Sequence, residues 1–147
     1  MYLLDTNHCT FIIEGRREVI ERWQDKENVQ VSTSVIVAGE LKFMAQNSQE
    51  RTTNLLKVNV FIQRINVYPI NLEIAAVYAE FKTELVRRFG PKQKIRRRTT
   101  KLGEIGISEH DLWIAATAIR YSLTVVSTDS DFERMQQVRE FNLESWV

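Results

Sequence analysis

The stretch Asp-Leu-Trp-Ile-Ala-Ala-Thr-Ala-Ile-Arg-Tyr-Ser-Leu-Thr-Val-Val-Ser-Thr-Asp, residues 111–129, predicts a helix that leads directly into a strand. Its first eleven residues are rich in alanine, which has the highest helix propensity of all residues. Residues 124–127 follow as a short apolar run with β-branched side chains, which is typical of a buried strand. Such a pair of elements indicates an α/β unit.

The same alternation extends outward along the chain. Further β-rich runs predict strands at 2–4, 29–31 and 65–70, with a weak last one near 142–146. Apolar residues at helical spacing predict helices over 10–25, 34–45, 50–64, 72–89 and 108–121. Strands that alternate with helices favour an α/β fold on a mostly parallel sheet.

Length and composition favour one globular domain over residues 1–147. The chain has 147 residues, of which 44% are hydrophobic and 27% charged, with five glycines and two prolines. A single cysteine, Cys9, excludes a disulfide within the chain, so nothing points to an oxidising compartment. No run approaches the roughly 20 apolar residues of a membrane span, and we expect a cytoplasmic protein.

Basic residues are concentrated in one segment. The net charge is +1, yet residues 87–101 contain eight Lys and Arg and no Asp or Glu. This predicts a long basic loop, about 87–107, inserted within the domain, either as a solvated loop or as a nucleic-acid contact. The candidate RNA-binding residues are Lys92, Lys94, Arg96, Arg97, Arg98 and Lys101.

Four acidic residues are expected at one edge of the sheet. Asp5 and Asp129 follow strands, whereas Glu40 and Asp111 lie near the beginnings of helices. In a parallel α/β fold, strand ends and helix beginnings share the edge where ligands bind. Each acid also has a structural interpretation, as a helix cap, a turn residue, a capping-box partner of Ser108, or an exposed helix residue.

Gathered carboxylates would require a cation. Two carboxylates ~5 Å apart repel by roughly 3 kcal/mol at an effective dielectric near 20. A cluster therefore implies bound metal or raised pKa values, and oxygen ligands suit Mg²⁺ or Mn²⁺. Zinc is disfavoured because no Cys and His stand at ligand spacing, and we interpret His8 and Cys9 as structural.

Four segments together resemble the PIN-domain nucleases, and within them the VapC-type toxins of bacterial toxin–antitoxin pairs. They are Leu-Leu-Asp-Thr-Asn at 3–7, Ser-Val-Ile-Val-Ala-Gly-Glu-Leu at 34–41, Asp-Leu-Trp-Ile-Ala-Ala-Thr-Ala at 111–118, and Leu-Thr-Val-Val-Ser-Thr-Asp-Ser-Asp-Phe at 123–132. The resemblance implies a sheet of about five parallel strands flanked by helices, often in a homodimer. It also implies a cognate antitoxin that covers the site, often with a basic side chain inserted among the carboxylates.

The resemblance also assigns roles to individual residues. The catalytic, metal-binding quartet would be Asp5, Glu40, Asp111 and Asp129, and Asp131 would be a candidate further ligand. Asn7 would support Asp5, and Ser127 would fill the hydroxyl position before Asp129. Two positions depart from the family pattern, because Val37 replaces a frequent threonine and His110 a frequent asparagine.

These observations predict a metal-dependent endoribonuclease that hydrolyses phosphodiester bonds without a nucleophilic side chain. Basic residues of the loop would contact phosphates, so neutralising Arg96, Arg97 and Arg98 should flatten the salt dependence of RNA binding. One alternative is a non-catalytic module that binds nucleic acid or an acidic partner. Another is a phosphatase or phosphotransferase with an aspartate nucleophile, although that chemistry usually needs a second Asp where Asn7 stands.

Overall fold

Five short parallel strands form the single sheet of the computed structural model, which describes residues 1–26 and 28–147. Their order is β3-β2-β1-β4-β5, and every neighbouring pair is parallel. This confirms the predicted α/β class. The strands are β1 (Tyr2–Leu4), β2 (Val31–Ser34), β3 (Asn66–Tyr68), β4 (Thr124–Val126) and β5 (Leu143–Glu144).

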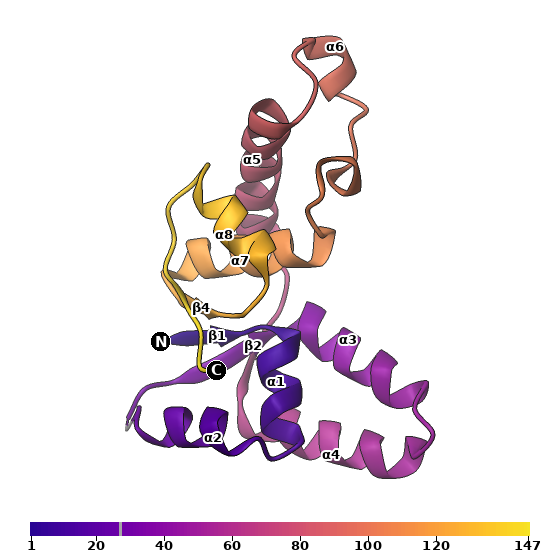
Figure 1. Ribbon diagram of the computed structural model, residues 1–147, viewed down its shortest axis with the longest axis vertical. Coiled ribbons are helices and arrows are strands. Elements are labelled where there is room, and N and C mark those ends of the chain that lie inside the picture. Colours follow the sequence, from indigo (N-terminus) through magenta and orange to yellow (C-terminus); the bar gives the residue numbers. More distant parts are fainter. Residues whose placement is uncertain (27) are drawn as a thin grey trace.

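Helices cover both sides of the sheet, with α1 to α4 on one side and α5, α7 and α8 on the other (Figure 1). No helix of the described residues is long and apolar enough to cross a membrane. The helices are α1 (Thr6–Ile13), α2 (Arg17–Gln24), α3 (Val35–Gln46), α4 (Arg51–Arg64), α5 (Leu72–Phe89), α6 (Lys94–Arg97), the 3₁₀ helix η1 (Leu102–Ile105), α7 (Glu109–Tyr121) and α8 (Ser130–Gln136).

The first predicted helix, 10–25, is wrong in both its start and its continuity. Helix α1 begins at Thr6, because the Asp5 side chain accepts a hydrogen bond from the backbone N–H of His8 and caps the helix. Gly15 then takes a left-handed conformation, with φ of +82°, and separates α1 from α2. Glycine adopts this conformation at little cost, so the chain turns there.

Strand β2 lies later in the sequence than predicted, at Val31–Ser34 and not at 29–31. All four of its residues are buried, although three of them carry hydroxyl groups. Ser32 and Thr33 donate hydrogen bonds to the β1 carbonyls of Tyr2 and Leu4, at 2.6 and 2.8 Å. The third hydroxyl, of Ser34, accepts from the backbone N–H of Val37 and caps α3. Because each hydroxyl finds a partner, polar residues occupy a central strand with little desolvation penalty.

The remaining predicted elements are confirmed, with bounds that shift by at most a few residues, and α5 matches its prediction at both ends. Helix α8 was not predicted. The predicted basic loop, about 87–107, contains the short helices α6 and η1, and its first residues, 87–89, belong to α5. Helix α6 stands beside the far end of α5, away from the sheet (Figure 1). The core lies between the sheet and its helices, where Leu3, Leu4, Val125 and Val126 are fully buried.

Candidate metal centre

A cavity of about 790 Å³ opens at the carboxyl edge of the sheet. Elements α1, α3, α7 and the loop from β4 into α8 contribute its walls. All four acids of the predicted quartet line it, together with Asp131: Asp5, Glu40, Asp111, Asp129 and Asp131. The tertiary structure thus brings together residues that are far apart in the sequence, since Asp5 and Asp131 are separated by 126 positions.

Asp5 lies at the floor of the cavity, directly after β1, and is only 4% exposed. One carboxylate oxygen accepts from the backbone N–H of His8 at 2.9 Å, and the His8 ring Nδ1 lies 3.2 Å from the same oxygen. The Ser127 hydroxyl donates to the other oxygen and accepts from the backbone N–H of Asp129 at 2.9 Å. Ser127 therefore joins the ends of β1 and β4 and holds two of the acids in place.

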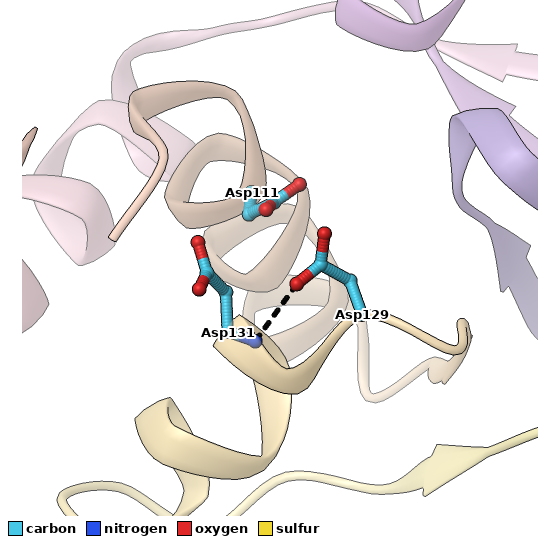
Figure 2. A group of neighbouring side chains, drawn as sticks. All are labelled: Asp111, Asp129 and Asp131. Carbon is cyan, nitrogen blue, oxygen red and sulfur yellow. Dashed lines mark hydrogen bonds between the residues drawn. The ribbon is translucent and has the colours of Figure 1, made fainter. Parts of the chain in front are cut away.

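Asp111, Asp129 and Asp131 form the tightest group of acids, with one oxygen of each within 4.8 Å of the others (Figure 2). Asp129 caps α8, because its carboxylate accepts from the backbone N–H of Asp131 at 2.9 Å. Asp131 in turn accepts from the backbone N–H of Ser108 at 2.8 Å, which ties α8 to the beginning of α7. The capping box considered for Ser108 and Asp111 does not form.

Asp111 is the one member of this group without a hydrogen bond or ion pair to any described residue. The pKa of the Asp111 carboxyl is raised to about 7, mainly by burial and further by the negative charges of its acidic neighbours. The neighbours, in order of effect, are Asp129, Asp131, Asp5 and Glu40. A bound cation would stabilise the negative charge of the Asp111 carboxylate, which no described residue of the protein does.

Glu40 reaches the cavity from the second turn of α3. The Thr6 hydroxyl donates to one of its carboxylate oxygens, and the His110 ring Nδ1 contacts the other. Both partners come from other elements, Thr6 from α1 and His110 from α7. Glu40 is therefore held across the opening between three helices and is not the freely exposed helix residue of the structural interpretation.

The donor set fits a hard divalent cation. All candidate ligands are carboxylate oxygens, which Mg²⁺ and Mn²⁺ prefer over nitrogen or sulfur. Oxygens on opposite sides of one Mg²⁺ are about 4.2 Å apart, since each Mg–O distance is about 2.1 Å. Adjacent oxygens of such an ion are closer still, about 3.0 Å apart, so Asp111, Asp129 and Asp131 would draw together from their present separation of up to 4.8 Å to share one ion. Asp5 and Glu40 line the same cavity outside this group.

Sequence reasoning missed three residues that contact the acids: Thr6, His8 and His110. His8 was interpreted as structural, and it is buried, but its ring also orients Asp5. Its Nε2 accepts from the backbone N–H of Trp146 at 3.3 Å, which places the ring proton on Nδ1, toward Asp5. The sequence signal was the position of each residue one to three places from a predicted ligand.

Asn7 was expected to support Asp5, and Cys9 to have a structural role. Asn7 is exposed and lines the cavity, but the hydrogen bonds of Asp5 within the described residues go to His8 and Ser127. Cys9 is fully buried, and burial raises the pKa of its thiol far above the usual range. A buried neutral thiol packs as an apolar side chain and is inert toward metals.

The six predicted RNA-binding residues lie on the basic segment around α6, and none of them lines the acidic cavity. Five of them are exposed, whereas Arg97 is half-buried. Its guanidinium donates to the backbone carbonyl of Lys92 at 2.6 Å and stabilises the segment itself.

The model of the PIN domain family matches residues 2–138. Ribonuclease VapC2 of Haemophilus influenzae is 29% identical over 148 residues, covering 99% of this chain and 98% of the relative. The tRNA(fMet)-specific endonuclease VapC of Salmonella typhimurium is 27% identical over 146 residues, covering 99% and 97%. The structure of DNA-bound VapBC from Salmonella typhimurium has a TM-score of 0.80 at 26% identity, covering 99% and 98%.

Proposed function

Because the chain belongs to the PIN domain family, we propose that it is a VapC-type endoribonuclease that uses Mg²⁺ or Mn²⁺. The relatives named as ribonucleases and as a tRNA-specific endonuclease support RNA as the substrate class. A non-catalytic binding module would need the carboxylates only as caps and turn residues. Two of the acids do cap helices, so the choice between these functions depends on the others.

The observation that carries the proposal is the state of Asp111. Its carboxylate is largely buried, has no hydrogen-bond partner among the described residues, and faces two other carboxylates within 4.8 Å. A structural role would not need this arrangement, since the repulsion destabilises the fold. A bound cation would remove the repulsion and make the cluster favourable.

Each acid has a proposed part in the reaction. Asp111, Asp129 and Asp131 would hold the ion, and Asp5 and Glu40 would complete the site from β1 and α3. A divalent cation supplies Lewis-acid stabilisation of the phosphate charge and lowers the pKa of the attacking water. Ser127, His8 and Thr6 would position the carboxylates, so that little reorganisation is needed when the phosphate enters.

Protein partners are proposed for the rim of the acidic cavity. Val35, Phe43 and Met44 line it and are exposed to 44%, 70% and 49%. Apolar side chains exposed together beside a functional site are typical of a surface that another protein covers. This supports a cognate antitoxin, in line with the VapBC assembly of Salmonella typhimurium. A homodimer is proposed from the family resemblance, and an RNA substrate would place the protein in the cytoplasm.

The direct test is cleavage of a total RNA pool by the purified protein with Mg²⁺ or Mn²⁺. Cleavage should require the ion, stop with a chelator, and disappear in the folded variants Asp5→Asn and Asp111→Asn. Glu140→Gln removes an exposed carboxylate outside the cavity and should retain full activity. An inert wild-type protein that also shows no ion binding by calorimetry would favour the binding module.

A further inference from the structure

A second cavity, of about 410 Å³, lies between α5 and the basic helix α6. Among the described residues, five basic ones line it and no acidic one does. Two come from α5 and three from the segment around α6: Lys82, Arg87, Lys94, Arg97 and Arg98. Only Lys94, Arg97 and Arg98 belong to the predicted RNA-binding set. Arg87 is the first residue of the basic run 87–101 but lies on α5, and Lys82 lies earlier on the same helix, outside the run.

Three of these five cations are available to a ligand. Arg87, Lys94 and Arg98 are exposed, and their side chains have no hydrogen bond or ion pair with the described residues. Arg97 donates to the carbonyls of Pro91 and Lys92 and stabilises the turn before α6. Uncompensated cations that converge on one cavity repel each other, and a bound anion removes this repulsion.

The second cavity is joined to the metal centre through the first turn of α7. Lys82, on the wall of the second cavity, donates to Glu109 at 2.6 Å, and the Tyr78 hydroxyl contacts the same carboxylate. Glu109 directly precedes His110 and Asp111, which line the acidic cavity. Tyr78 also stacks on Trp113 with ring centroids 3.8 Å apart, so α5 is packed firmly against α7 at this point.

We propose that the cavity between α5 and α6 binds the phosphates of single-stranded RNA next to the bond that is cut, a site that rests on the proposed nuclease function. A strand with one phosphate in the acidic cavity extends over the first turn of α7 into the basic cavity. The volume is in the range of small-molecule sites, a size that suits individual nucleotides of a single strand or loop. The neighbouring anions are held by the basic residues, which offsets the repulsion between RNA and the carboxylates.

The position of each cation on the fold separates this proposal from general attraction by basic residues. Arg51, Lys57 and Arg88 are exposed as well, but they do not line the cavity. The lining triple variant Arg87→Gln/Lys94→Gln/Arg98→Gln and the control triple variant Arg51→Gln/Lys57→Gln/Arg88→Gln each remove one Lys and two Arg. Net charge therefore falls equally in both.

The experiment is fluorescence anisotropy of a labelled single-stranded oligouridine, titrated with each protein in a chelator over a range of salt concentrations. For three phosphate contacts on a single strand, the lining variant should lower the slope of log K against log salt by about 2. Its affinity should fall roughly tenfold or more at moderate salt, and the control variant's affinity less than about threefold. Thermal unfolding of both variants verifies that they are folded.

Other outcomes would overturn the proposal. Equal losses in the two triple variants would show attraction by overall charge, and no loss in either would remove the cavity from RNA binding. If the lining variant loses affinity for polyglutamate and retains affinity for RNA, the cavity serves an acidic protein. Cleavage by the wild-type protein is measured separately, so a protein that is inert with metal but binds RNA through this cavity would refute only the nuclease function.

Discussion

Replacing Asp111 with asparagine should make the metal-free protein more stable above neutral pH. The folded pKa of Asp111 is about 7, against an ordinary value of 3.8, because of burial and the surrounding carboxylates. Raising the pKa from 3.8 to about 7 corresponds to roughly 4 kcal/mol of destabilisation of the charged form. Water and counterions at the open cavity reduce this figure, so we expect a gain of about 2 kcal/mol in Asp111→Asn.

The gain should depend on pH in a defined direction. The folded pKa is higher than the unfolded pKa, so folding favours the protonated form of Asp111. Below about pH 4 the residue is protonated in both states and asparagine brings no advantage. As the pH rises through the window from about 4 to about 7, the wild-type protein progressively loses stability relative to Asp111→Asn.

Urea unfolding in a chelator, at about pH 4.5 and about pH 8, measures this difference. Glu140→Gln is the matched control and should change the free energy of unfolding by less than about 0.5 kcal/mol at either pH. Adding Mg²⁺ at pH 8 should stabilise the wild-type protein, by about 2.7 kcal/mol at 100 times its Kd, and stabilise Asp111→Asn much less. A variant that is no more stable than wild type at pH 8, or gains equally at both pH values, would refute the electrostatic account.

Three further predictions concern the frame of the site. Gly15→Ala should lose about 1 kcal/mol of stability in thermal unfolding, because Gly15 has a φ of +82°. Gly103→Ala is the control, since Gly103 has open space around it and no positive φ; equal effects of the two substitutions would contradict this. Thr33→Val should lose about 1–2 kcal/mol in urea unfolding, since the Leu4 carbonyl loses its donor, and an unchanged midpoint would assign the hydroxyl no role. Ser127→Ala should weaken metal affinity by roughly 10- to 100-fold in calorimetry, because the Ser127 hydroxyl hydrogen-bonds both the Asp5 carboxylate and the Asp129 backbone. An unchanged affinity would show that this hydroxyl does not position the ligands.

Element types were largely predictable because they depend on local periodicity. Helix α5 was placed correctly at both ends, since its apolar stripe continues until Gly90 and Pro91 interrupt it. The errors arose where tertiary contacts override local preference. Strand β2 extends over three hydroxyl residues because β1 offers carbonyl acceptors to two of them and the third, Ser34, caps α3. The polarity of these residues alone favours an earlier end of the strand.

Helix α8 shows a second kind of limit. It has seven residues, too few for a clear periodic pattern, and its beginning depends on the Asp129 cap. The same side chain was a predicted metal ligand with a turn as its structural alternative. In the structure Asp129 both caps α8 and lines the acidic cavity, so a capping role and a place at the metal site do not exclude each other.

The sequence by itself determined which edge of the sheet carries the acids, because strand ends and helix beginnings share an edge in any parallel α/β arrangement. It could not determine which acids lie within reach of one another, since that depends on strand order and on helix packing across the sheet. Only the tertiary structure placed Asp131 beside Asp111 and Asp129. It also placed Ser127 against the Asp5 carboxylate and His110 against the Glu40 carboxylate. The charge run likewise identified a basic segment, but the placement of α6 beside α5 decided which of its cations line a common cavity.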